Sequence, residues 1–159
     1  MESFIEAISK LNNNKSSSIG KVIEITGNTC KVERENLPTL EDVRLNAIEG
    51  DFSNKIIIYP AIGSEVLCLE ISGDKEETAI VQYTEIDKVL IEINGAKFEM
   101  SGGKFQIKNK EADLKKLHND WLNELKNAII LTPSGPGRFS TTTKAKFDLL
   151  KQDNEKLLG

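Results

Sequence analysis

Apolar and polar residues alternate in three successive units between Ile91 and Glu111. Aligned in steps of seven residues, the stretch reads IEINGAK, FEMSGGK and FQIKNKE. Each unit has apolar residues at its first and third positions with a polar residue between them. This pattern predicts a short strand with one buried and one solvated face. The glycines that follow the first two strands predict sharp turns, because glycine adopts positive φ at little cost.

Strands this short cannot bury an apolar face in isolation, so the repeat needs a partner. One arrangement is an ordinary meander packed on helices of the same chain. The other is an intertwined trimeric β-prism or β-helix in residues 90–111, in which identical chains complete one another. We expect the prism. Its axis would be lined by the apolar positions Ile91, Ile93, Phe98, Met100, Phe105 and Ile107.

Residues 18–89 are predicted to be all-β. Several short strands alternate with turn signals such as Gly27-Asn28, which is typical of a small sandwich or a five-stranded barrel. A long loop before the third strand and the entry to the fourth lead us to expect an OB-like barrel. The predicted strands are 20–25, 29–34, 43–48, 56–60, 61–71 and 78–83.

Residues 1–17 are predicted to form a short amphipathic helix and a linker. Phe4, Ile5, Ile8 and Leu11 recur three or four residues apart, which places them on one helical face. A polar stretch, Asn12–Ser18, follows them. The segment is therefore either a docking helix on a tether or a frayed N-terminal extension.

Residues 112–159 are predicted to form a helical hairpin. The first helix, Ala112–Leu131, would begin at an Asn109 cap and end before Pro133. Ser134–Gly137 would form the turn, and a last helix would span Lys144–Leu158, capped by one of Thr141 to Thr143. The first helix carries the apolar stripe Leu114, Leu117, Trp121, Leu125, Ala128 and Ile129, and the last carries Phe147, Leu150, Leu157 and Leu158. The fold class is therefore mainly β with terminal helices.

The composition favours a protein that shares its core with partner subunits. Hydrophobic residues make up 38% of the 159 residues and charged residues 29%, which is slightly lean for a self-sufficient core. A net charge of −4 gives no electrostatic reason to expect nucleic-acid binding. A single-stranded nucleic-acid binder stays an alternative, because OB barrels often have that function. The barrel segment offers it only Phe52, Tyr59 and Tyr83 for stacking.

No catalytic constellation is evident in the sequence, and we expect no enzyme and no cofactor. His118 is the single histidine, and Trp121 is interpreted as a core anchor or a subunit contact. Cys30 and Cys68 could form a disulfide, but free thiols in a cytosolic folding environment are expected. We expect neither a signal peptide nor a membrane span. A regulatory subunit of an enzyme is a third class, which would show a stable heteromeric partner.

The order of these parts resembles phage baseplate assembly protein V, the central spike family of contractile tails. The resemblance rests on Ile19–Val22, the stretch from Tyr59 to Leu67, the repeats of Ile91–Glu111, and Leu131–Gly137 before the last helix. It covers most of the chain and is architectural. It implies a homotrimer on the tail axis that caps the tail tube and faces the host cell envelope.

The resemblance also implies tail-tube and other baseplate proteins as partners, and a virion-tail location after assembly in the host cytoplasm. The chain lacks the His-x-His motif that holds iron in some tapered needles of the family and ends in predicted helices, so a blunt hub with a separate tip protein is expected. A spike of a related, type VI-like injection system is an alternative. No nucleic-acid partner is expected. The predicted trimer interface comprises Ile91, Ile93, Phe98, Met100, Phe105, Ile107, Leu114, Leu117, Trp121 and Leu125.

Overall fold

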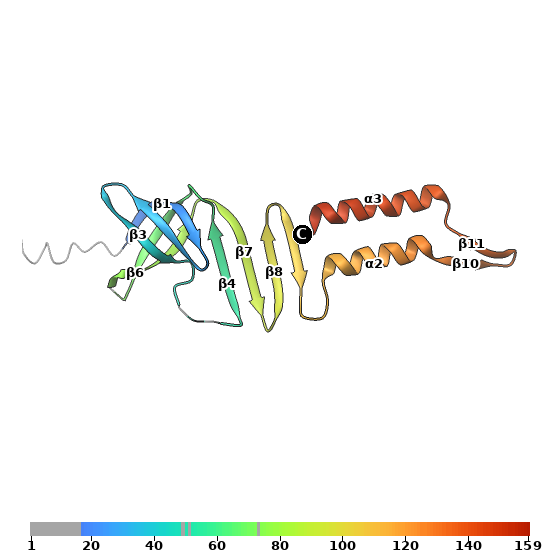
Figure 1. Ribbon diagram of the computed structural model, residues 1–159, viewed down its shortest axis with the longest axis horizontal. Helices are drawn as coiled ribbons and strands as arrows, with labels where there is room; N and C mark the ends of the chain where they lie inside the picture. The colour runs from blue at the N-terminus through green and yellow to red at the C-terminus, as the bar shows by residue number, and fades with distance from the viewer. Residues whose placement is uncertain (1–16, 49, 51, 73) are drawn as a thin grey trace, which may run out of the picture. The chain divides into compact units, whose positions relative to one another are not determined.

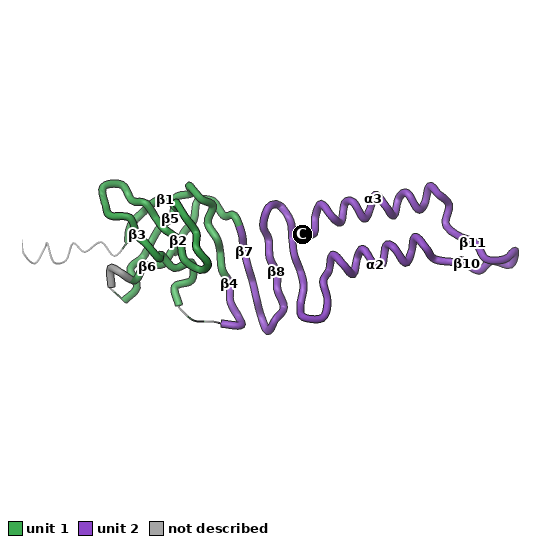
Figure 2. Tube along the Cα trace, viewed as in Figure 1, with its two compact units in different colours: residues 1–50, 57–87 green, residues 51–56, 88–159 purple. Residues whose placement is uncertain are grey.

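The chain divides into two compact units. The structure is a computed structural model that describes residues 17–48, 50, 52–72 and 74–159. The predicted N-terminal helix lies outside these residues. Within the chain, one unit comprises residues 1–50 and 57–87, and the other comprises residues 51–56 and 88–159 (Figure 2).

The first unit is a closed five-stranded barrel, which confirms the OB-like barrel predicted for this part of the chain. Its strands pair in the order β1-β2-β3-β6-β5, and β1 closes the ring on β5. β3 and β6 pair in parallel, and the other neighbours are antiparallel. The strands are β1 (Ser17–Thr26), β2 (Thr29–Arg34), β3 (Leu37–Arg44), β5 (Glu65–Ile71) and β6 (Asp74–Tyr83).

Alternate residues of these strands point inward and form the barrel core. Val22 of β1, Val32 of β2 and Val66 of β5 are almost completely buried, as the period of two requires. Cys30 and Cys68 lie in the same core as free thiols. Burial raises the pKa of Cys30 to about 12 and that of Cys68 to about 11, so both side chains behave as small apolar residues.

Two predictions for the barrel strands are wrong. The third strand runs over Leu37–Arg44 instead of 43–48, because Pro38 does not interrupt it. The pairing of β2 with β3 is irregular between Val32 and Arg34, and the carbonyl of Pro38 accepts hydrogen bonds from the Arg34 guanidinium. A proline is tolerated in a strand where the ladder does not need its N–H. The second error is the strand at 56–60, which does not pair with the barrel strands although Ile57 and Tyr59 pack into the barrel core.

That strand, β4 (Lys55–Pro60), belongs to a four-stranded sheet of order β4-β7-β8-β9. The repeat and the residues just before it supply the rest of the sheet, as β7 (Ile86–Ile93), β8 (Ala96–Ser101) and β9 (Lys104–Lys108). These three strands pair consecutively and antiparallel. The backbone pairing within one chain is therefore that of the meander alternative, and the intertwined trimeric prism stays a prediction.

Sharp turns link the strands of the repeat, as the glycines predict. Asn94 and Gly95 form the first turn, and Gly102 and Gly103 form the second, all with φ between 51° and 81°. Asn94 is the non-glycine residue among them, and asparagine tolerates this region better than most residues. Its backbone N–H donates to the Asn54 side chain over 2.7 Å.

The C-terminal part contains α2 (Leu114–Asn127) and α3 (Thr141–Leu157), linked by a β-hairpin (Figure 1). The hairpin consists of β10 (Ile129–Thr132) and β11 (Gly135–Arg138), with Pro133 and Ser134 between them. The chain places a strand pair where we predicted the end of one helix and a simple turn. Neither helix in the described part of the chain has the length and apolar content needed to cross a lipid bilayer.

The boundaries of both helices differ from the prediction for local reasons. Ile129 and Ile130 are β-branched, and they pair with Arg138 and Gly137 across the hairpin, so the helix ends at Asn127. Asp113 caps α2, because its carboxylate accepts from the Lys116 N–H.

The predicted caps at Asn109 and at Thr141 to Thr143 are wrong. Asn109 folds the preceding turn by accepting from the backbone N–H groups of Glu111 and Ala112. Ser140, one residue earlier than predicted, caps α3 by accepting from the Thr143 N–H over 3.1 Å.

Candidate subunit interface

The apolar residues of the repeat form one face of the sheet. Ile91 pairs directly with Phe98, and Phe98 pairs with Ile107 on the next strand, so these side chains form one row across three strands. Met100 and Phe105 form a second row, and the Phe98 and Phe105 rings lie 6.1 Å apart, centroid to centroid. Such cross-strand neighbours stabilise a sheet by contact along one face. We call this surface the sheet's apolar face.

The sheet's apolar face is not enclosed by the chain itself. Ile93 is 54% exposed, and Met100 and Ile107 are also exposed. Ile91, Phe98 and Phe105 are half-buried. A contiguous apolar surface of this kind on a folded chain is typical of a surface that contacts another molecule.

An apolar groove of about 400 Å³ lies between the sheet's apolar face and the start of α2. Its wall contains Ile91, Ile93, Phe98 and Ile107 from the sheet, together with Leu114 and Leu117 from α2. Six of the ten predicted interface residues thus line one groove. Ala96 and Ala112 line it as well, and their small side chains give it room.

The remaining predicted residues extend the apolar surface beyond the groove. Trp121 is 63% exposed on α2, and Leu125 is half-buried one turn later. Met100 and Phe105 lie in the sheet but do not line the groove. Leu117 and Trp121 are four residues apart, so their side chains are neighbours on one helical face.

Polar side chains outside the predicted interface set contribute to the contact between α2 and α3. Asn154 of α3 donates to the Asn119 side chain over 3.0 Å, and its oxygen lies 3.2 Å from Nδ1 of His118. Lys126 forms an ion pair with Asp148 at 2.7 Å. These polar contacts orient the two helices and leave Trp121 exposed.

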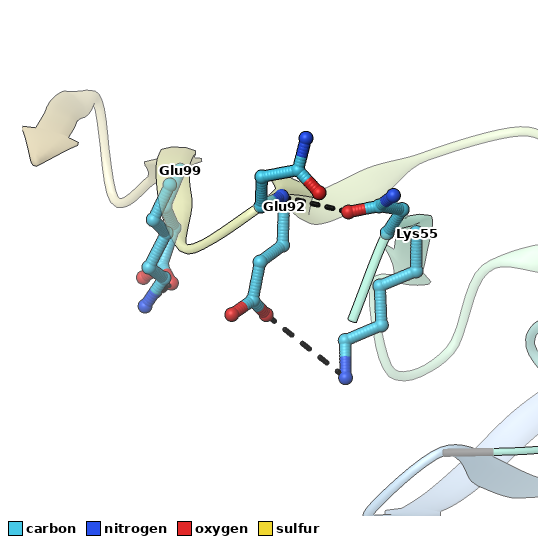
Figure 3. Close-up of polar contacts among 6 residues, drawn as sticks. Lys55, Glu92 and Glu99 are labelled. Carbon is cyan, nitrogen blue, oxygen red and sulfur yellow. Dashed lines mark hydrogen bonds and ion pairs between the residues drawn. The ribbon is translucent and has the colours of Figure 1, made fainter. Parts of the chain in front are cut away.

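The opposite face of the sheet is polar and has internal ion pairs. Glu99 accepts a hydrogen bond from Lys97, 2.7 Å away on the same strand, and Glu92 lies 4.0 Å from Lys55 (Figure 3). The hydrogen bond from Lys97 lowers the pKa of Glu99, and the positive charges of Lys88 and Lys108 act in the same direction. The polar face is therefore suited to water, and the asymmetry marks the apolar face as the one to be covered.

The second unit has little core of its own. Among its described residues, Leu158 is the buried hydrophobic residue, at 4% exposure. Leu158 lies beside Phe105 in a parallel bridge, and the Gly159 N–H donates to the Phe105 carbonyl over 2.9 Å. This contact anchors the end of α3 to β9. The barrel, by contrast, encloses a continuous cluster that includes Val22, Val32 and Val66.

Sequence reasoning missed the apolar surface of the β10–β11 hairpin. Leu131 is 84% exposed, and Ile129 and Ile130 are exposed as well. We predicted these residues on a helix, where Ile129 would have continued the stripe of Trp121. The signal that could have revealed the hairpin is the succession of β-branched residues followed by Pro133 and two glycines.

Comparison of the sequence with known proteins does not assign the chain to a family. No protein-family model matches the sequence, and no curated protein matches it significantly. Within the described ranges, no group of three or more His, Cys, Asp or Glu residues is placed to hold a metal ion. What the described residues offer is an exposed apolar surface, which can be stabilised by removal from water.

Proposed function

We propose that the chain is a structural protein that forms a homotrimer at the centre of a phage tail baseplate. In this proposal it is the hub or spike that caps the tail tube and faces the host cell. The observation that carries the proposal is the open apolar face of the sheet, continued along α2 by Leu117 and Trp121. Three copies around one axis would bury this face from all sides.

The pairing of the repeat suggests how each copy would contribute. The backbone groups of β8 are already paired on both sides within one chain, so another chain is not needed to complete that ladder. What lacks a partner is the apolar face. Each chain would therefore supply one wall of a three-walled prism, with the polar face of Glu99 outward.

A prism of this kind would be stiff, because shape change would require water to enter the apolar interior. A rod that transmits force along a tail needs that stiffness. The barrels would form a collar that caps the tail tube, and α2 and α3 of three chains would form a helical cluster. The resemblance in the order of parts supports the assignment to a contractile tail, with tube and other baseplate proteins as partners.

The nucleic-acid alternative receives little support from the barrel. Tyr59 and Tyr83 pack against its core, which leaves them poorly placed as a stacking platform. We expect fluorescence titration with labelled oligonucleotides at low salt to show no saturable binding.

The experiment that tests the proposed function is immunogold electron microscopy of tail particles from cells that encode the chain. An antibody against the chain should label one end of the tail, at the baseplate. A matched strain with an early stop codon in this gene should lose both the label and complete tails. Recovery of the chain outside the particle fraction, with unlabelled and complete tails, would reject the assignment.

A further inference from the structure

Another apolar surface lies on the outside of the barrel, where the core does not need it. Ile19 is 65% exposed on β1, and it pairs directly with Leu67 of β5. Leu69, two residues further along β5, is exposed too. Val81 of β6 is exposed at a bulge, where its neighbours Ile80 and Gln82 pair with Cys68 and Leu67. We call Ile19, Leu67, Leu69 and Val81 the outer barrel patch.

The outer barrel patch is distinct from the residues that hold the barrel together. Along β1, Gly20 and Val22 point inward and are buried, whereas Ile19 points outward. Along β5, Val66 and Cys68 are buried, whereas Leu69 is not. Outward positions on a barrel strand are ordinarily polar, so four aliphatic side chains on three adjacent strands need an explanation.

We propose that the outer barrel patch binds the chain's own N-terminal segment, through Phe4, Ile5, Ile8 and Leu11. The first reason is where that segment joins the barrel. It enters β1 at Ser17, and Ser17 is the residue that pairs with Leu69 of the patch. Ile19 follows two residues later. The segment therefore reaches the fold at the edge of the surface it would cover.

The second reason is a match of length. If Phe4 to Leu11 form the helix that their spacing predicts, they would span about 10 Å at about 1.5 Å per residue. The three strands of the patch, about 4.8 Å apart, are about 10 Å across. The linker Asn12–Ser16 has five residues, which is a usual length for a connection between a helix and a strand that pack together.

The third reason is the size of the patch. Four partly exposed aliphatic side chains offer far less than the roughly 800 Å² per partner of a stable interface between separate proteins. A tethered segment needs much less area, because its effective concentration is on the order of millimolar. The small patch and the short tether together favour binding within one chain. This inference does not depend on the proposed function.

A disulfide trap tests the proposal. The variant Ile8→Cys with Leu67→Cys joins the middle of the apolar stripe to the middle of the patch. The native Cys30 and Cys68 will not compete, because both are buried in the barrel core. Mild oxidation should give a cross-link within one chain, seen as a single-chain mass that is lower by two hydrogens and as a faster band in denaturing gels without reductant.

The control pairs Ile8→Cys with Asn28→Cys, which places the second thiol in the exposed turn after β1, at its far end. This pair should form the internal cross-link at least about tenfold more slowly, since β1 is about 30 Å long. Equal rates for the two pairs, or cross-links between chains with Leu67→Cys, would overturn the proposal.

Limited trypsin digestion tests the docking of the N-terminal segment without introduced cysteines. Lys10 lies within the segment that would dock, and Lys15 lies in the linker. Cleavage after Lys10 should be slow compared with cleavage after Lys15, and Leu67→Asp should accelerate it about tenfold while leaving Lys15 unchanged. Equal cleavage at both lysines in the unaltered chain would contradict docking.

Discussion

Replacement of Trp121 by alanine separates a subunit contact from an ordinary surface position. In the single chain this side chain is 63% exposed on α2, so its removal should cost the chain itself little stability. If three copies cover it, the same change removes a large apolar contact from each. The two cases predict different outcomes for one variant.

The magnitude follows from the exposed area. A fully exposed tryptophan side chain presents about 250 Å², of which 63% is about 160 Å². Covering half of that area at about 25 cal/mol per Å² stabilises the assembly by about 2 kcal/mol per subunit, or about 6 kcal/mol per trimer. At 1.4 kcal/mol per tenfold change, the trimerisation constant falls by about 10⁴. The midpoint concentration varies as its square root, so it rises about a hundredfold.

Sedimentation equilibrium over a concentration series measures that midpoint for the unaltered chain and for Trp121→Ala. Asn123→Ala is the matched control, because Asn123 is exposed on the same helix about 200° around the axis. Its midpoint should not change. Trp121 is also the single tryptophan, so its emission should shift to shorter wavelength as the unaltered chain associates. An unchanged midpoint for Trp121→Ala, with emission that stays accessible to quenchers, would refute the reasoning.

Three further predictions concern the two units separately. Gly20→Ala should destabilise the barrel by about 1–3 kcal/mol in chemical denaturation, because a Cβ there would lie 2.5 Å from the Glu33 carbonyl oxygen. Gly137→Ala is the control and should leave stability unchanged, because a Cβ there would lie 3.6 Å from the Ile130 carbonyl oxygen. Glu99→Gln should remove a contribution of less than about 1 kcal/mol that the unaltered chain has at neutral pH. Because the folded pKa of Glu99 lies below the ordinary 4.5, that contribution is lost as pH falls below about 4.5, and identical pH profiles for the two proteins would contradict it. Cys30 and Cys68, whose pKa values are raised to about 12 and 11, should react with a thiol reagent only after unfolding, and fast labelling of the folded chain would show that the core is open.

The parts of the fold that follow from the sequence are those set by short-range alternation. The alternation of the repeat predicted β8 and β9, and the glycines placed their turns, because period and turn chemistry are local properties. The pairing partner of a strand is not local. The strand at Lys55–Pro60 reads like any barrel strand, and its place beside β7 depends on contacts far along the chain.

The end of α2 shows a similar limit. Leu125, Ala128 and Ile129 continue a helical spacing, and the spacing alone favours a longer helix. The hairpin replaces the end of that helix because Ile130 pairs with Gly137 in the β-ladder. The common face of the candidate residues was more predictable, since residues four apart on a helix or two apart on a strand share a face wherever the element lies. Which face remains exposed to solvent depends on the tertiary packing, so it is known only from the folded structure.

The mass of the unaltered chain in solution is the most direct test of the account. The chain has a mass of 17.7 kDa, so a trimer has three times that value, about 53 kDa. Light scattering coupled to size exclusion at micromolar concentration should give the trimer mass. A value near 17.7 kDa across the same concentrations would mean that a single folded chain leaves the sheet's apolar face in water. That result would contradict the claim that three copies bury it.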